Sequence, residues 1–256
     1  MRRLLPLIAL LLPTPALADV TATYTAGDRT FTAEVNDGGN ARIGIDGRFV
    51  LIRRDGVDYV VIYTNDGVPH VARADAALVK FGDTRPAPSA FKTELTGEGD
   101  AVVAGYSGTV WRFGPAGELP LELVMSNDST LAPVGQLFAR LGTAFMAEMD
   151  AKAGPGSEAS KGAAALFAHG TPIRVTQAEV EPGPGKVMVE LRSVSTARID
   201  PHRFDLPAPV MAADAFFSVV APPPPPIADE GITVDGSDTG VTDTTTDPAQ
   251  APRKPE

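Results

Sequence analysis

The stretch FVLIRRDGVDYVVIY (residues 49–63) decides the fold of this 256-residue chain. Its centre, Asp55-Gly56, is a dipeptide typical of the positive-φ positions of tight β-hairpin turns. The runs on either side, 49–52 and 59–63, are apolar at every position, so each predicted strand carries apolar side chains on both faces. Such strands lie in a sheet that is covered on both sides, or that meets a helix on one side and an apolar concavity on the other.

Similar turn signals recur about every ten residues between positions 26 and 67, each of them containing glycine beside aspartate. They separate short β-prone segments and predict a meander in which each strand pairs with the one before it. The predicted strands are 30–35, 41–45, 49–53, 59–64 and 68–72. A polar stretch with Gly82, Pro86 and Pro88 then predicts a long loop near 82–99.

Strands are predicted to resume at 101–106, 109–113 and 119–125. The residues 41–45 and 119–125 alternate between apolar and other side chains, which indicates strands with one solvent-facing side.

Two helices are expected to cover this sheet. Apolar residues at helical spacing predict an amphipathic helix over 130–150, with Asp128 or Ser129 placed to cap it. A shorter helix is predicted at 158–168, before Gly170. Two closing strands follow at 172–181 and 186–196, then a short turn or helix at 201–206.

We therefore predict a mainly β (α+β) domain over 19–208, an antiparallel half-open β-barrel or strongly curved sheet covered by one or two helices.

The first 18 residues are typical of an export signal. Arg2 and Arg3 precede the apolar run 4–12, and Ala16-Leu17-Ala18 fits the small-x-small cleavage pattern. The run is shorter than the ~20 residues that span a bilayer, which argues against the alternative of an uncleaved anchor. Without a cysteine at the cut, the signal is of the general secretory type rather than a lipoprotein signal. We expect a periplasmic or secreted protein with no transmembrane span after cleavage.

The C-terminal part, 209–256, differs in composition from the rest. It starts with the apolar segment 212–220, which could pack back on the domain or form a last strand. Five consecutive prolines, 222–226, then lead into an acidic, polar tail. This tail has too few apolar residues to offset its ordering entropy, so we predict that it is disordered. It would serve as a spacer or docking arm for an envelope protein, or only as a solubilising extension.

Charge and cysteine content exclude several classes of function. The chain has 22 basic and 32 acidic residues; removal of the leader with its two arginines leaves a net charge of about −12. Nucleic acid should repel such a chain, and we expect no nucleic-acid partner. The chain has no cysteine, which excludes disulfides, thiolate catalysis and cysteine-based metal sites.

No motif points to catalysis. No Gly-x-Ser-x-Gly nucleophile elbow is present, and the histidines His70, His169 and His202 lie in three separate segments. We predict no catalytic residue, no metal site and no cofactor, and expect a protein that is not an enzyme. A hydrolase with a carboxylate pair that no motif marks is the remaining catalytic alternative.

Aromatic and aliphatic side chains on the strands are the candidate binding residues. They would line an apolar groove on the concave face of the sheet, or form ordinary core beneath the helices. The candidate lining residues are Phe49, Leu51, Tyr59, Val61, Tyr63, Trp111 and Phe113.

A family resemblance adds to this picture. The meander at 41–72, with IDGRF (45–49) entering its second hairpin, the helical block 130–169 and HGTPI (169–173) leading into the last strands resemble a bacterial periplasmic family of unknown function. That family is distantly similar to the lipoprotein carriers LolA and LolB. The resemblance implies a half-open antiparallel barrel, closed on one side by helices, with an apolar cavity.

Two functions follow as hypotheses. The first is an exported, non-catalytic binding or carrier-like protein whose cavity takes a lipid or a lipoprotein acyl chain. The second is an envelope structural or interaction protein with a filled barrel and a docking tail.

Overall fold

The computed structural model describes residues 19–83, 93–115, 120–178 and 185–220, all within one compact unit, Met1–Ala221. The predicted leader and the predicted acidic tail lie outside the described residues.

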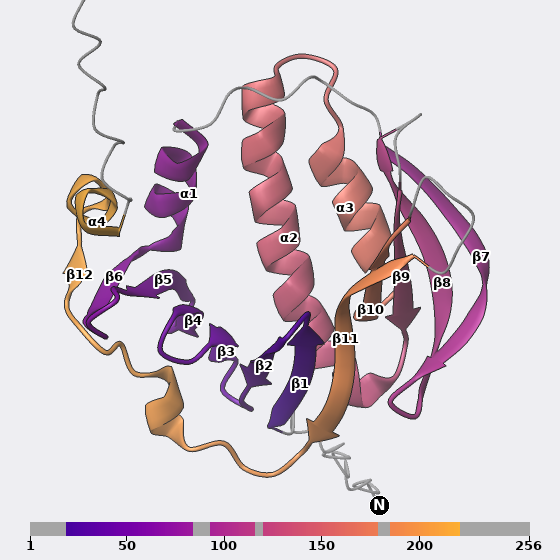
Figure 1. Cartoon of the computed structure of the whole chain (residues 1–256), viewed down its shortest axis with the longest axis horizontal. Coiled ribbons are helices and arrows are strands. Elements are labelled where there is room, and N and C mark those ends of the chain that lie inside the picture. Colours follow the sequence, from indigo (N-terminus) through magenta and orange to yellow (C-terminus); the bar gives the residue numbers. More distant parts are fainter. Residues whose placement is uncertain (1–18, 84–92, 116–119, 179–184, 221–256) are drawn as a thin grey trace, which may run out of the picture. The chain divides into compact units, whose positions relative to one another are not determined.

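In the described residues, twelve strands form one continuous sheet in the order β12-β6-β5-β4-β3-β2-β1-β11-β10-β9-β8-β7. Neighbouring strands are antiparallel, except that β12 runs parallel to β6. The sheet is open, with β12 and β7 at its edges, and it curves around the helices (Figure 1). The predicted fold class, a strongly curved antiparallel sheet covered by helices, is confirmed. The strands are β1 (Val20–Ala26), β2 (Arg29–Val35), β3 (Ala41–Ile45), β4 (Phe49–Arg54), β5 (Val57–Tyr63), β6 (Pro69–Arg73), β7 (Thr93–Val103), β8 (Tyr106–Pro115), β9 (Leu121–Ser126), β10 (Thr171–Gln177), β11 (Lys186–Ser195) and β12 (Val210–Met211).

The first strand joins the two halves of the sheet. On one side β1 continues the N-terminal meander, with Thr21 opposite Glu34 of β2. On its other side Thr21 lies opposite Ser195 of β11, the last long strand. A single sheet therefore runs from the N-terminal hairpins to the C-terminal ones.

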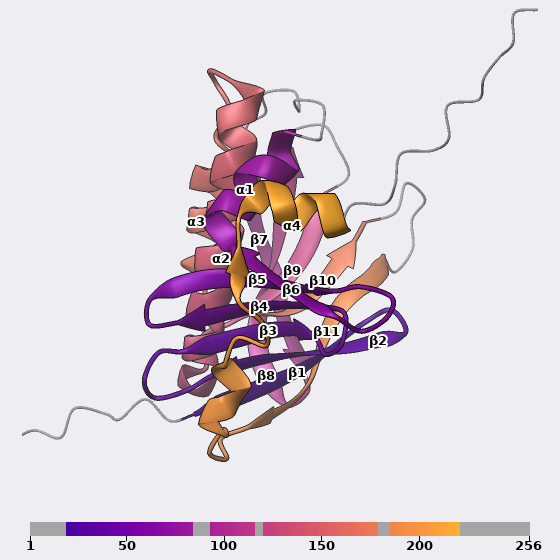
Figure 2. The same ribbon diagram turned by 90° about the vertical axis from the view of Figure 1, so that its left-hand side faces the viewer.

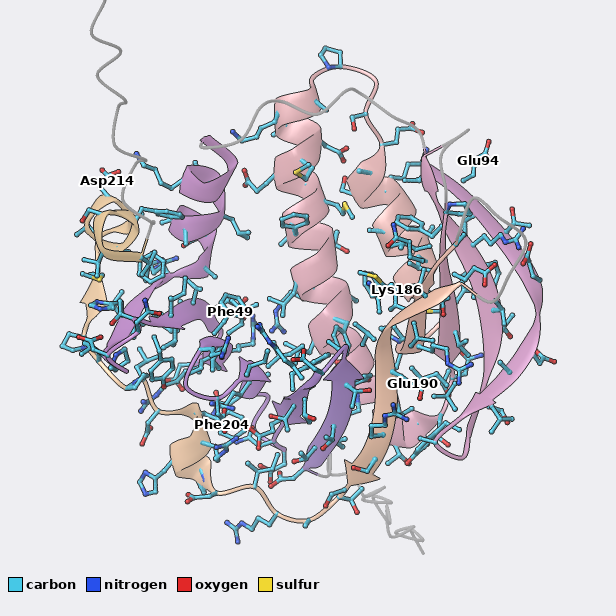
Figure 3. The ribbon with its side chains drawn as sticks, in the orientation of Figure 1. Phe49, Glu94, Lys186, Glu190, Phe204 and Asp214 are labelled. Atoms are coloured by element: carbon cyan, nitrogen blue, oxygen red, sulfur yellow. The ribbon has the colours of Figure 1, made fainter. Side chains whose placement is uncertain are left out.

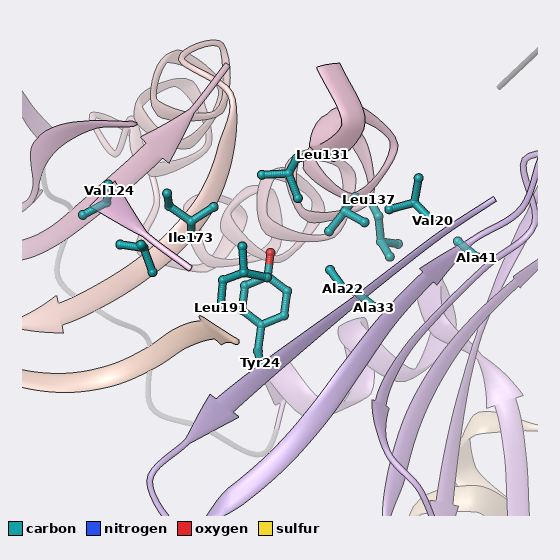
Figure 4. Packing of buried hydrophobic residues seen from close by; sticks show 12 residues of the cluster. Val20, Ala22, Tyr24, Ala33, Ala41, Val124, Leu131, Leu137, Ile173 and Leu191 are labelled. Carbon is teal, nitrogen blue, oxygen red and sulfur yellow. The ribbon is translucent and has the colours of Figure 1, made fainter. Parts of the chain in front are cut away.

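The helix α2 (Ala132–Ala153) lies against the concave face of the sheet, and a short 3-10 turn, Ser129–Leu131, precedes it. The Asp128 carboxylate accepts a hydrogen bond from the amide of Thr130 (2.8 Å) and caps this turn. Leu131, Val134 and Leu137 are buried in one cluster with apolar side chains of β1, β2 and β10, and Figure 4 shows Leu131 and Leu137 facing Ala22, Ala33 and Ile173.

At the centre of that core lies Tyr24, which has no solvent exposure. Its hydroxyl donates to the carbonyl oxygen of Pro172 (3.1 Å), which satisfies a polar group inside an apolar cluster. Burial raises the pKa of Tyr24 far above its ordinary value, so the phenol stays neutral.

A second helix, α3 (Ala159–Phe167), covers the sheet over β8 and β9. It begins at the end of α2, where Asp150 accepts hydrogen bonds from the amides of Ala159 and Ser160 (both 2.8 Å). These two bonds satisfy amides that a helix start leaves without partners.

The predicted loop near 82–99 is wrong in part. A helix, α1 (Ala74–Asp83), follows β6 directly, because alanine-rich sequence has the highest helix propensity and Ala74 and Ala77 are buried on the sheet. At the other end, β7 begins at Thr93. Gly97 on this strand lies opposite Trp111 in the ladder, and the indole ring packs over it. Residues 84–92 lie outside the described part.

The strand expected at 101–106 is also corrected. Ala104 and Gly105 both have positive φ (50° and 86°) and form the hairpin turn between β7 and β8. The apolar run around Val102 had hidden this turn.

The chain after β11 crosses to the other edge of the sheet through a 3-10 turn, Pro201–Phe204. It then forms β12 and α4 (Ala213–Val220), which lies beside α1 at the β6 end of the sheet (Figures 1 and 2). Of the two expectations for 212–220, packing back is confirmed and a strand is wrong, because Phe216 on one helix face is buried to 1% exposure. The compact unit therefore runs past residue 208.

Candidate functional site

A cavity of about 620 Å³ lies between the sheet and the helices at the β4–β5 end of the concave face. Its walls come from β4 and β5 below, α2 on one side, and α1 and α4 on the other. Every lining residue in the described part of the chain is apolar or glycine. The lining residues are Phe49, Leu51, Val60, Ile62, Ala74, Ala77, Leu78, Leu141, Gly142, Phe145, Phe216 and Phe217.

The floor of the cavity follows from the register of the β4–β5 hairpin. The Asp55-Gly56 turn sets Phe49 opposite Ile62 and Leu51 opposite Val60. Residues directly opposite each other in an antiparallel pair point to the same face, so these four side chains form one apolar strip. Phe49 is 43% exposed although it lies on an inner strand, and it stands in the space between α1 and α2 (Figure 3).

The α1 wall leaves room because its sheet-facing side chains are small. Ala74 and Ala77 pack on β5 and β6 with 6% and 7% exposure. Among the described side chains of this helix, Leu78 is the large one in the lining. Because Ala74 and Ala77 are too short to reach across to the opposite wall, space remains between α1 and α2.

The α2 wall is Leu141, Gly142 and Phe145. A Cβ at Gly142 would meet the Phe167 ring of α3 at 2.6 Å, so glycine allows α3 to lie directly against the α2 backbone. The close contact with α3 holds this wall on the side away from the cavity.

The third wall is α4. Phe216 and Phe217 lie edge to face, with ring centroids 5.7 Å apart. Lys80 of α1 pairs with Asp214 of α4 (2.8 Å) at the surface, where the two helices lie side by side.

A charged group lies just beyond one end of the cavity floor, outside the lining itself. Arg53 and Asp58 form the pair that follows Leu51 and Val60 on the same strip, with Nη1 and Oδ2 2.9 Å apart. Arg140 of α2 donates from Nη2 to the other Asp58 oxygen (3.1 Å). Desolvation lowers the pKa of Arg140; the Asp58 carboxylate raises it and the Arg53 charge lowers it again, with a net decrease.

The structure places the seven sequence-predicted residues in three locations. Phe49 and Leu51 line the cavity. Tyr59, Val61 and Tyr63 lie on the opposite face of β5, where Val61 is fully buried in a cluster with Leu206 and Ala208.

The other two, Trp111 and Phe113, do face the helices, but they lie beneath α3 in a filled cluster with Ala163 and Leu166. Trp111 stacks on His169 with ring centroids 3.7 Å apart. These rings are core rather than cavity lining.

Sequence reasoning missed the cavity residues of α1, α4 and the alternate positions of β5. The signal for the latter was present, because a two-residue Asp-Gly turn fixes which residues of the two strands share a face. Applied to this hairpin, that rule selects Val60 and Ile62 as the partners of Leu51 and Phe49.

Within the described ranges, no group of three or more His, Asp or Glu side chains is arranged to hold a metal ion. No helix of the described residues has the length and apolarity needed to cross a membrane.

Comparison with known proteins gives distant likenesses. No protein family model matches the chain, and no curated protein sequence matches it. Among solved structures, MucB aligns with a TM-score of 0.31 and 14% identity, over 75% of this chain and 58% of MucB. A crystal structure of MucB in complex with MucA(peri) gives 0.29 and 15%, over 71% and 51%. The Pseudomonas aeruginosa MucA/MucB complex gives 0.31 and 14%, over 75% and 56%.

The chain thus spans little more than half the length of the MucB chains. With such low TM-scores, these likenesses carry no assignment of function, which has to come from the chain's own residues.

Proposed function

We propose that the protein is an exported, non-catalytic binding module of the bacterial periplasm that holds an apolar chain, such as a lipid or lipoprotein acyl chain, in the cavity between β4, β5 and the helices. The observation that carries the proposal is the cavity itself. Its volume of about 620 Å³ lies in the range of small-molecule sites, and the described residues that line it are apolar or glycine.

The exposure of the lining supports the same conclusion. Phe49 leaves 43% of its surface accessible on an inner strand of the sheet, where a folded protein normally buries such a ring. A bound hydrocarbon chain would remove this apolar surface from water, at a gain of about 25 cal/mol per Å².

The alternative, a structural protein with a filled interior, has less support. Two clusters around Tyr24 and Trp111 are filled, but the β4–β5 end of the same concave face is not. A docking role for the tail and the periplasmic location rest on the sequence, through the leader and the proline-rich segment.

The test is a titration of the purified protein with the neutral apolar dye N-phenyl-naphthylamine, whose fluorescence rises in apolar surroundings. We expect saturable binding. Leu78→Glu would put a charge in the cavity lining and should weaken binding at least about tenfold, because an unpaired charge costs more than 1.4 kcal/mol in apolar surroundings.

The matched control is Val79→Glu, which adds the same charge to the same helix at a site that is 49% exposed. It should leave binding unchanged. Absence of saturable binding, or equal binding by the two variants when both keep their helical and strand content, would overturn the proposal.

A further inference from the structure

The apolar strip of the β4–β5 hairpin ends in a charged pair. Phe49–Ile62, Leu51–Val60 and Arg53–Asp58 are three successive same-face pairs of one ladder. Residues two apart on a strand are about 7 Å apart, so the first charged pair lies one step beyond the cavity floor. Arg140 reaches the same place from α2, where it directly precedes the lining residue Leu141.

This group carries more positive than negative charge. Two guanidinium groups share the single carboxylate of Asp58, at 2.9 Å from Arg53 and 3.1 Å from Arg140. The Arg140 side chain is 33% exposed and that of Asp58 26%, so solvent compensates the excess charge only in part.

Arg140 also has a donor without a partner. Its Nε is buried and makes no hydrogen bond, although its Nη2 is engaged with Asp58. A buried N–H group without an acceptor costs free energy comparable to a lost hydrogen bond. The Nε position itself is closed to solvent, so an added anion would pair with the exposed part of the group and supply the missing negative charge.

From the charge and the cavity together, we propose that the ligand is a single-chain amphiphile with a carboxylate head, a long-chain fatty acid. Its chain lies between Leu51, Val60 and Phe145, and its carboxylate pairs with Arg140 and Arg53. The guanidinium fork suits a carboxylate because two parallel N–H groups meet its two oxygens. The inference rests on the proposed function, since it assigns the head group of a ligand whose chain fills the same cavity.

The experiment compares laurate with lauryl alcohol as competitors of bound N-phenyl-naphthylamine. The two share a chain and differ only in the head group, so their ratio isolates the contribution of the charge. We expect laurate to displace the dye at a concentration at least about tenfold lower, since hydrogen bonds to charged groups contribute that much or more. In Arg140→Gln the ratio should fall toward one.

The control is Arg54→Gln. Arg54 is the neighbour of Arg53 in sequence but pairs with Asp205 away from the cavity, so its loss should keep the preference for laurate. Asp58→Asn gives a second, opposite test. It removes the only carboxylate of the group and should make laurate bind more tightly relative to the alcohol, an effect that damaged packing would not produce.

The outcomes separate the two proposals. Equal displacement by laurate and lauryl alcohol from a protein that binds the dye would overturn the carboxylate assignment and leave the apolar site. A preference for laurate that survives Arg140→Gln and does not rise in Asp58→Asn would overturn it too. Failure of the dye to bind at all would overturn the proposed function itself.

Discussion

Replacement of Asp150 by asparagine should destabilise the protein at neutral pH and remove part of its sensitivity to acid. The Asp150 carboxylate accepts hydrogen bonds from the Ser157 hydroxyl (2.6 Å), the Ser160 hydroxyl (2.5 Å) and the amides of Ala159 and Ser160 (both 2.8 Å). Desolvation alone would raise the pKa of Asp150, but these bonds outweigh it and lower the pKa from 3.8 to about 2.

The size of the effect follows from that shift. A difference of nearly two pKa units corresponds to an upper limit of about 2.5 kcal/mol. The site is partly exposed and solvent screens it, so we expect a loss of about 1 kcal/mol in the free energy of unfolding for Asp150→Asn. The folded-state pKa is depressed, so this contribution is present above the unfolded pKa near 4 and is lost as the pH falls toward 2.

The assay is urea unfolding followed by the fluorescence of Trp111, the single tryptophan of the chain, which packs beneath α3. The wild type and the variant should differ by about 1 kcal/mol at pH 7 and converge near pH 2. A variant that is as stable as the wild type at pH 7, or equally destabilised at both pH values, would refute the role assigned to the ionised carboxylate.

Three further predictions follow from single contacts. Phe216→Ala removes the buried anchor of α4 and should cost about 3–5 kcal/mol by urea unfolding; retention of wild-type stability would contradict that anchoring role. Gly44→Ala should lower the free energy of unfolding by more than about 2 kcal/mol, because φ is +151° and a Cβ would lie 2.1 Å from the Phe49 carbonyl oxygen. A decrease in melting temperature no larger than that of an ordinary surface substitution would argue against it. Glu34→Gln leaves Arg203 without its buried carboxylate on the convex face and should cost about 3 kcal/mol while dye binding by the folded protein stays unchanged, whereas a loss of dye affinity would show that the two faces are coupled.

The strands of the N-terminal meander are predictable from the sequence because glycine beside aspartate marks each turn between them. Asp-Gly and related signals delimit β2 to β6 to within two residues, and the apolar spacing of α2 is clear from its own segment. The same reasoning fails at α1 and β7. There the deciding factors are tertiary: α1 is stabilised by two alanines on the sheet, and β7 pairs along its whole length with β8, so that Trp111 packs over Gly97.

The candidate site is predictable to a smaller extent. Phe49 and Leu51 could be selected because they lie in the doubly apolar hairpin. Tyr59, Val61 and Tyr63 were selected by aromatic or apolar character, without the register that turns them to the convex face. No local pattern indicates that α4, far along the chain, supplies a wall next to α1, because that contact exists only once the chain has returned past the β6 edge.

The position of β1 between β2 and β11 has a consequence for biogenesis. A chain that folds from its N-terminus can pair its early hairpins at once, because those partners are adjacent along the sequence. The pairing of β1 with β11 can form only after residues near Ser195, the partner of Thr21, are present. Since such long-range closure is entropically expensive and slow, the sheet stays incomplete until nearly the whole domain is available, and its unpaired strand edges are open to aggregation during the delay.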